Sequence, residues 1–228
     1  LKYFERPTTI DIAFARNEAL LNAEGDWIAI LDVDDVWGSK KLEFQIKALF
    51  DNDIDDVKIV FTGCEVITQN KIVKINQKFS QKRVFEDLLS LELSVPWSSV
   101  LFSKETFNSL NGFDAKYPSA HDLDFLIKCA KKHNFLFVDR NLVSINYHDK
   151  SLTSLNKNRK GNYYNEIIDV LAPYIDNNSA ILGITKMKVS HLFLLLKMMQ
   201  FRSFFKVFFK ISLKEFSYFP LILFKKVF

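Results

Sequence analysis

The 228-residue sequence is poor in residues that break or cross-link a chain: it has six Gly, five Pro and two Cys. With so few breakers, a chain of this length can form long elements and bury a sizeable core. Cys64 and Cys129 lie far apart in apolar segments and lack the spacing of a metal site. A single disulfide between them is possible but not implied, and a reducing compartment is the default expectation.

Two further absences concern membranes and secretion. No secretory signal peptide opens the chain, which begins at Leu1 without a methionine, as if inside a fold, and is compatible with a fragment. In the Phe- and Leu-rich tail from Val189 onward, cations interrupt every long apolar run. No stretch of the tail reaches the roughly 18 uncharged residues that a spanning helix needs. We therefore expect no leader peptide, and no spanning helix within the tail from Val189 onward.

Phenylalanine is abundant, with 23 residues, and the net charge of +4 is unevenly spread. Residues 183–228 carry nine Lys or Arg and one acid, a net +8, which leaves −4 on residues 1–182. Four tail cations recur every fourth residue and would share one helical face: Arg202, Lys206, Lys210 and Lys214. The tail therefore predicts a basic amphipathic helix on an anionic membrane surface, or a helix packed on the domain or in a homodimer. Its aromatics are not interleaved with base-reading polar groups, which argues against nucleic acid.

Strand-like and helix-like patterns alternate up to about residue 147, which predicts an α/β domain with a mixed sheet flanked by helices. The expected strands are 27–31, 57–62, 135–138 and 142–147, with a hairpin over 65–75. The expected helices are 16–23, one starting at Ser39, 84–91, 104–110 and 121–133. The helix over 104–110 should end in a left-handed cap at Asn111-Gly112. The second helix should turn Leu42, Ile46 and Leu49 inward. A polar stretch at 151–160 suggests a division into a catalytic domain, 1–155, and a helical C-terminal region, 156–228.

The strand at 27–31 ends in three acids, Asp32, Asp34 and Asp35. The carboxyl end of a strand is where an α/β sheet usually places ligand chemistry. If the strand continued, Asp32 and Asp34 would point to the same side, roughly 6.5–7 Å apart at Cα. Two such carboxylates suit a hard cation that also holds phosphate oxygens. The alternative is a solvated loop of acids, and Asp35 faces the other side unless the backbone turns.

Several blocks together resemble the family-2 glycosyltransferases, which are nucleotide-sugar enzymes of GT-A fold. In order they are ARN at 15–17, AEGDWI at 23–28, LDVDDVW at 31–37, KLE at 41–43 with Gln45, NGFD at 111–114, HDLD at 121–124, and YH at 147–148 before SLT at 151–153. They cover roughly residues 10–155. Ala19, Val33 and Ser39 depart from the family pattern, and His121 stands where an acid is usual. The family's first strand and base-binding acids normally need more than the 31 residues that precede Asp32.

The resemblance implies roles for the donor side of the site. Asp34 would bind Mn²⁺ or Mg²⁺ directly against the two donor phosphates, and Asp32 would reach the ion or the ribose. His148 would add a metal ligand or bind phosphate, and Arg16 would pair with the diphosphate or the nucleotide. Packed or solvated side chains are the alternatives for His148 and Arg16.

On the acceptor side, the resemblance makes Asp122 the general base that takes the proton of an attacking hydroxyl, with inversion of configuration. Asp124 would line the acceptor groove. Trp97 could stack on an acceptor sugar there, with Ser98 and Ser99 beside it. Asp122 could instead serve only as a favourable charge at the start of its helix, and Trp97 could belong to the core.

These residues predict an inverting, metal-dependent glycosyltransferase, peripheral on the cytoplasmic face of the cell membrane, that uses a nucleotide-diphosphate sugar and a glycan or lipid-linked acceptor. Residues 30–36 also match the haloacid-dehalogenase-like phosphatase motif, in which the first Asp is a nucleophile, but no convincing downstream acidic pair follows. A third reading is a truncated, non-catalytic protein that binds nucleotide sugar and membrane.

Overall fold

The computed structural model describes residues 11–68, 71–75, 79–147, 157–219 and 222. The chain divides into two compact units. The sheet unit comprises Leu1–Phe85 and Leu93–His148, and the helical unit comprises Glu86–Glu92 and Asp149–Phe228. The domain boundary expected at residue 155 lies outside the described residues. The short segment Glu86–Glu92 belongs to the helical unit although it precedes much of the sheet unit in sequence.

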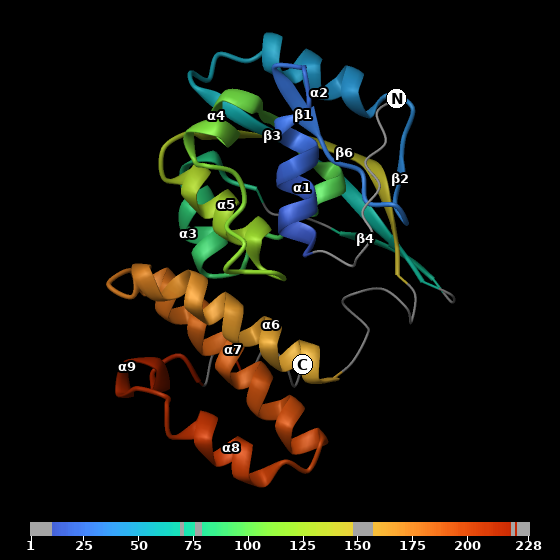
Figure 1. The fold of residues 1–228 in the computed structure, drawn as a ribbon. Helices are drawn as coiled ribbons and strands as arrows, with labels where there is room; N and C mark the ends of the chain where they lie inside the picture. Colours follow the sequence, from blue (N-terminus) through green and yellow to red (C-terminus); the bar gives the residue numbers. More distant parts are fainter. Residues whose placement is uncertain (1–10, 69–70, 76–78, 148–156, 220–221, 223–228) are drawn as a thin grey trace. The chain divides into compact units, whose positions relative to one another are not determined.

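The sheet unit is built on a mixed sheet, which confirms the predicted fold class (Figure 1). Its strands follow the order β1-β5-β3-β6-β2, and β4 pairs with β3. Among the described strand pairs, β3 and β6 run parallel and the others run antiparallel. The strands are β1 (Trp27–Ala29), β2 (Val36–Trp37), β3 (Val57–Ile67), β4 (Ile72–Ile75), β5 (Leu101–Ser103) and β6 (Asn134–Asn146).

The central strands are longer than predicted. β3 continues through the expected end at Thr62 into the hairpin with β4, whose turn residues 69–70 lie outside the described residues. The two strands expected at 135–138 and 142–147 are one strand, β6, with an irregular register opposite Gly63. A Cβ at Gly63 would lie 2.7 Å from Asn141 Oδ1, so glycine permits this close passage. Cys64 of β3 and Cys129 are both buried free thiols.

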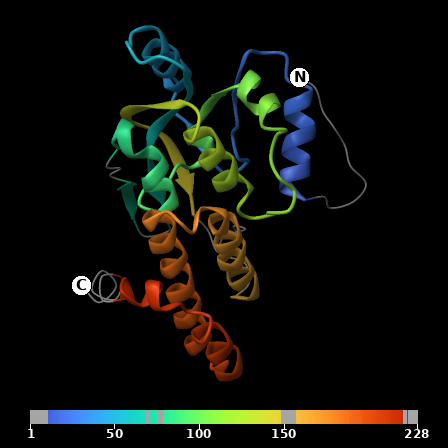
Figure 2. The ribbon, with the colours of Figure 1, turned by 90° about the vertical axis from the view of Figure 1, so that its left-hand side faces the viewer.

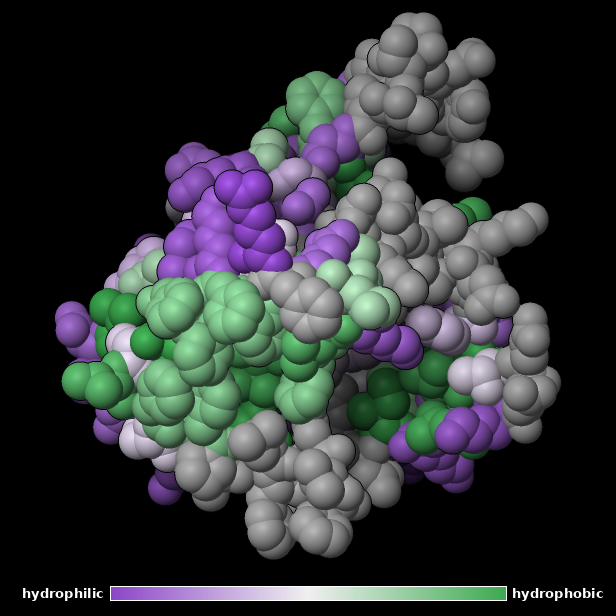
Figure 3. Space-filling model, turned by 90° about the horizontal axis from the view of Figure 1, so that it is seen from below, coloured by the Kyte–Doolittle hydropathy of each residue, from purple (hydrophilic) through white to green (hydrophobic). Residues whose placement is uncertain are grey.

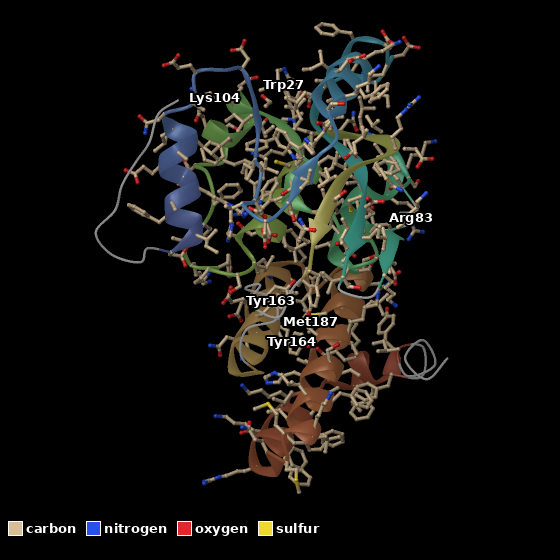
Figure 4. The ribbon with its side chains drawn as sticks, turned by 90° about the vertical axis from the view of Figure 1, so that its right-hand side faces the viewer. Trp27, Arg83, Lys104, Tyr163, Tyr164 and Met187 are labelled. Atoms are coloured by element: carbon tan, nitrogen blue, oxygen red, sulfur yellow. The ribbon has the colours of Figure 1, made fainter. Side chains whose placement is uncertain are left out.

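Helices flank the sheet, and Figures 2 and 4 show α1 on one side and α2 on the other. β1 and α4 meet at one end, where Trp27 pairs with Ser103 and the Lys104 N–H donates to the Asp26 carbonyl at 2.8 Å (Figure 4). The helices of this unit are α1 (Ile12–Leu21), α2 (Lys41–Phe50), α4 (Lys104–Ser109) and α5 (His121–Ala130), with 3₁₀ turns at Gln81–Arg83 and Trp97–Ser99.

The predicted inner face of α2 is wrong. Leu42 and Ile46 are 42% and 37% exposed, whereas Lys41 and Gln45 are fully buried. The physical reason lies in backbone carbonyls beneath the helix: Gln45 Nε2 donates to Val60 O at 2.8 Å and to Ser99 O at 2.9 Å. Lys41 Nζ in turn donates to Gln45 Oε1 at 2.8 Å. Burial lowers the pKa of Lys41 to about 8. Ser39 is not the N-cap, because Lys40 occupies that position.

The helical unit contains most of α3 (Val84–Leu89), then α6 (Lys157–Leu171), a 3₁₀ turn (Ala172–Tyr174), α7 (Asn178–Lys197), α8 (Phe201–Phe208) and α9 (Leu213–Phe216). α7 packs against α6, α8 and α9. Gly183 lets α7 approach residues 86–92, since a Cβ there would collide with the Leu89 carbonyl oxygen. Lys186 Nζ donates to Ser90 O at 2.8 Å, which fixes the same crossing.

The basic tail is not one continuous helix. Arg202 and Lys206 lie on α8, and Lys214 lies on α9, with the helix interrupted between them. The interruption has a local cause, because Ser212 and Glu215 form a capping box that begins a new helix. By length and composition α7 is the one helix, among the described residues, that could cross a bilayer, and 50% of that stretch is buried inside the structure.

Candidate active site

The acids that follow β1 lie in a turn, which we call the acid turn (residues 32–35). β1 ends at Ala29, and the Asp35 N–H donates to the Asp32 carbonyl at 3.0 Å. The expectation that Asp32 and Asp34 share one side of a continuing strand is therefore wrong. The chain must leave β1, at one end of the strand order, and reach β2 at the other end. The acid turn gives the chain this change of direction, which a continuing strand would not.

Ser98 holds the acid turn in place from the 3₁₀ turn before β5. Its buried hydroxyl accepts the Asp32 N–H at 3.1 Å and donates to Asp35 Oδ2 at 2.6 Å. Its carbonyl accepts the Trp37 Nε1–H at 2.6 Å. Partial burial raises the pKa of Asp35, and the Ser98 hydrogen bond opposes that shift. The sequence placed Ser98 near an acceptor groove and did not reveal this anchoring role.

Arg16 connects the acid turn to the start of α5. Its Nη2 donates to Asp32 Oδ1 at 2.5 Å, and its Nη1 lies 2.9 Å from His121 Nε2. Because a guanidinium only donates, Nε2 accepts, and the His121 proton resides on Nδ1, 3.1 Å from Pro118 O. The structure thus brings Arg16 into contact with two residues that lie 16 and 105 positions from it in the sequence. Asp122 follows His121 directly, at the first turn of α5.

Two of the resembling blocks also meet in space. Asn17, next to Arg16, accepts the Phe113 N–H and donates to the Phe113 carbonyl, each at 2.8 Å. Gly112 lies between them with φ of +73°, and a Cβ there would come within 2.7 Å of Asn17 Oδ1. The left-handed backbone expected at residues 111–112 is confirmed. This contact fixes α1, and with it the guanidinium of Arg16, against the segment that leads to α5.

The residues expected on the acceptor side have different environments. Asp124 is 8% exposed and forms an ion pair with Lys128 at 2.6 Å. Burial raises its pKa, and the hydrogen bond from Lys128 opposes the rise. Asp122 is partly exposed, and the Leu123 N–H donates to its Oδ1 at 2.8 Å. It therefore keeps more access to a ligand than Asp124.

Trp97 belongs to the core, so its expected stacking on an acceptor sugar is contradicted. Its side chain is 4% exposed, and its ring centroid lies 5.3 to 5.9 Å from those of Phe102, Phe113 and Phe125. The abundance of phenylalanine in this part of the chain encloses the indole. Its Nε1 has no hydrogen-bond partner within the described residues. His148, the expected third metal ligand, lies outside the described residues.

The acid turn suits a metal that is shared with a ligand. No three His, Cys, Asp or Glu side chains of the described residues lie close enough to enclose an ion. Mg²⁺ commonly binds through one or two carboxylates, with substrate phosphates and water completing its shell. Asp32 and Asp34 of the acid turn are carboxylates of this kind, although Asp32 is also paired with Arg16. The residues present therefore fit a metal–phosphate complex and do not form a closed protein cage.

The sequence matches the family model described as glycosyltransferase like family 2 over residues 2–208. The chain belongs to this family. Among its curated relatives, an uncharacterized glycosyltransferase of Rickettsia typhi is 28% identical over 65% of this chain and 48% of its own length. An Escherichia coli protein, UDP-Glc:alpha-D-GlcNAc-diphosphoundecaprenol beta-1,3-glucosyltransferase WfgD, is 28% identical over 72% and 61%. The family resemblance is confirmed, and the chain spans about half the length of the curated relatives it matches.

Solved glycosyltransferases share the fold. TarS residues 1–349 of S. aureus, in complex with UDP-GlcNAc, align with a TM-score of 0.52 at 14% identity, over 88% of this chain and 56% of that one. Mannosyltransferase PcManGT of Pyrobaculum calidifontis, in complex with GDP-Man and Mn²⁺, aligns with a TM-score of 0.52 at 16% identity, over 98% and 61%. The sheet unit of this family-2 chain therefore has the GT-A fold, as the motifs predicted.

Proposed function

We propose that this chain transfers a sugar from a nucleotide-diphosphate sugar to a hydroxyl of a glycan or lipid-linked acceptor, with inversion. The observation that carries the proposal is the bridge from Asp32 through Arg16 to His121, which links the acid turn to the residue beside Asp122. A transferase needs a diphosphate site and an acceptor base in one place. Family membership supports this chemistry over the phosphatase alternative.

On the donor side, Asp34 and Asp32 would hold Mn²⁺ or Mg²⁺, and the relative solved with GDP-Man and Mn²⁺ supports this choice of ion. A divalent ion bound there would offset the negative charge that develops on the leaving diphosphate. The Arg16 guanidinium, which has five N–H donors and uses two on Asp32 and His121, can turn its remaining donors to a phosphate oxygen.

On the acceptor side, Asp122 would take the proton of the attacking hydroxyl. Such positioned proton transfer contributes about 10²–10⁴-fold to rate. Asp124 is held by Lys128 and would act by shaping the acceptor side rather than by accepting a proton. Attack opposite the departing diphosphate inverts the anomeric centre.

The helical unit would place this chemistry at the cytoplasmic face of a membrane. On α8, α9 and the segments beside them, several large apolar side chains are exposed, among them Phe205, Phe209 and Leu213. Seen from below, the structure shows an apolar cluster bordered by hydrophilic side chains (Figure 3). Exposed rings beside cations fit an interface of anionic lipid. The lipid-linked acceptor named for the Escherichia coli relative supports the same location.

The test is turnover of UDP- and GDP-sugars by the purified chain, with Mn²⁺, with Mg²⁺ and with excess chelator. We expect metal-dependent release of the nucleoside diphosphate, loss of at least about 10²-fold in Asp122→Asn, and a comparable loss in Asp34→Asn. Asp53→Asn, which removes an exposed acid from the loop after α2, serves as the matched control. Undiminished turnover in excess chelator would refute the requirement for a divalent metal. Binding of nucleotide sugar without turnover would favour the non-catalytic alternative.

A further inference from the structure

The helical unit contains a groove of about 640 Å³ lined by α6, α7 and α8 and the segment after α8. This volume is in the range of small-molecule sites, roughly 300–1,000 Å³. The apolar side chains of the lining, which we call the apolar wall, include Leu195, Met198 and Val207. The same lining carries nitrogen groups from three lysines, two asparagines, one glutamine and one histidine. The groove thus offers a hydrocarbon wall and a set of hydrogen-bond donors within one helical unit.

His191 is the most informative residue of the groove. It is 9% exposed, and its Nδ1 is buried without a hydrogen-bond partner in the described part of the chain. Its ring lies 5.8 Å from that of Tyr164 of α6, which Figure 4 labels. Burial lowers the pKa of His191, so the imidazole is neutral at pH 7 and can place its one N–H on Nδ1. A buried polar atom without a partner is costly, and because His191 lines the groove, an acceptor that reaches Nδ1 from there would satisfy it.

The charge at the groove favours an anion. Lys188 is already engaged, with Nζ 2.7 Å from Glu215 Oε1 and 2.9 Å from Lys210 O. Lys206 and Lys210 are exposed lining residues that extend from the tail. Asp169 is the one acid among the described lining residues, so the cations exceed it. A phosphate group accepts several charge-assisted hydrogen bonds at once and suits this arrangement.

We propose that this groove binds an amphiphile with a phosphate head group, the phosphate at His191, Lys206 and Lys210 and the hydrocarbon against Leu195, Met198 and Val207. The groove would bind this ligand whether or not the sheet unit transfers sugar. The same phosphate chemistry could come from a lipid or from free phosphate, and the apolar wall favours the lipid.

Binding to the full chain can be measured by calorimetry with dodecyl phosphate below its micelle concentration, beside inorganic phosphate and dodecanol. We expect dodecyl phosphate to bind at least about tenfold more tightly than either comparison ligand. The double variant Lys206→Ala/Lys210→Ala should lose about tenfold or more in affinity, since it removes two charge-assisted contacts. The matched control, Arg202→Ala/Lys214→Ala, removes the same charge from exposed positions of the same tail that do not line the groove.

Three outcomes would overturn the proposal. Equal losses in the two double variants would indicate diffuse attraction to the basic tail. Inorganic phosphate binding as tightly as dodecyl phosphate would remove the role of the apolar wall. An unchanged affinity in His191→Phe, which keeps an aromatic ring and removes Nδ1, would show that the buried nitrogen takes no part in binding. Far-ultraviolet circular dichroism of each variant checks the helices, and sugar transfer is not part of the readout.

Discussion

Replacing Ser98 with alanine tests whether the acid turn depends on one buried hydroxyl. Ser98→Ala removes the acceptor for the Asp32 N–H and the donor to Asp35. A hydrogen bond between neutral groups contributes about 0.5–1.5 kcal/mol and one to a charged group about 1.5–3 kcal/mol. Because Asp35 is partly exposed, water replaces part of the second bond, so we expect a loss of about 2–3 kcal/mol at pH 7.

The assay is urea unfolding followed by tryptophan fluorescence. All three tryptophans, Trp27, Trp37 and Trp97, lie in the sheet unit, so the signal reports the unit that contains the acid turn. Ser99→Ala is the matched control. Ser99 is equally buried, but its hydroxyl makes one described bond, to the Pro96 carbonyl at 2.6 Å. The control should lose about 1 kcal/mol.

The pH dependence gives a second criterion. The Ser98 hydrogen bond favours ionised Asp35, so its removal raises the pKa of Asp35 further in the folded state. A carboxyl whose folded pKa is raised loses stability as pH rises through that pKa. The destabilisation by Ser98→Ala should therefore be largest at neutral pH and shrink toward pH 4. Equal losses in Ser98→Ala and Ser99→Ala, with no pH dependence, would refute the reasoning.

Three further perturbations follow from the structure. Arg16→Gln should lower nucleotide-sugar turnover by about tenfold or more, because it breaks the ion pair with Asp32. Steady-state kinetics measures this loss, and an unchanged turnover would contradict the role of Arg16. The lowered pKa of Lys41, about 8 against 10.5, means that the wild type gains stability as pH rises from 8 toward 10.5; urea unfolding of Lys41→Met should lack this gain. Binding to vesicles with anionic lipid should weaken by about 1 kcal/mol for each cation removed, in Arg202→Ala and in Lys214→Ala, and a sedimentation assay without any change would contradict the membrane role.

The sequence predicts the parts of this protein that depend on local pattern. The mixed α/β class, the hairpin of β3 and β4, and the left-handed backbone at Asn111 and Gly112 all follow from periodicity and turn chemistry. The family blocks identify Arg16 and Asp32 as residues of interest. The structure then brings them into contact.

The parts that fail depend on partners far along the chain. Helical periodicity turned Leu42 inward, but Gln45 satisfies carbonyls at Val60 and Ser99, which no helical pattern can reveal. An apolar run before acids predicted a continuing strand, whereas the need to reach β2 across the sheet produces the acid turn. Trp97 was open to two interpretations because an indole suits both a sugar and a ring cluster. Burial decides it.

The pairing of Arg16 with Asp32 has a thermodynamic consequence for ligands that bring both charges. A cation alone would compete with the guanidinium for Asp32, and a phosphate alone would compete with Asp32 for the guanidinium. When both arrive together, each partner of the resting pair exchanges one opposite charge for another and neither is left uncompensated. Metal and nucleotide should then raise one another's affinity by the same factor, as reciprocal linkage requires.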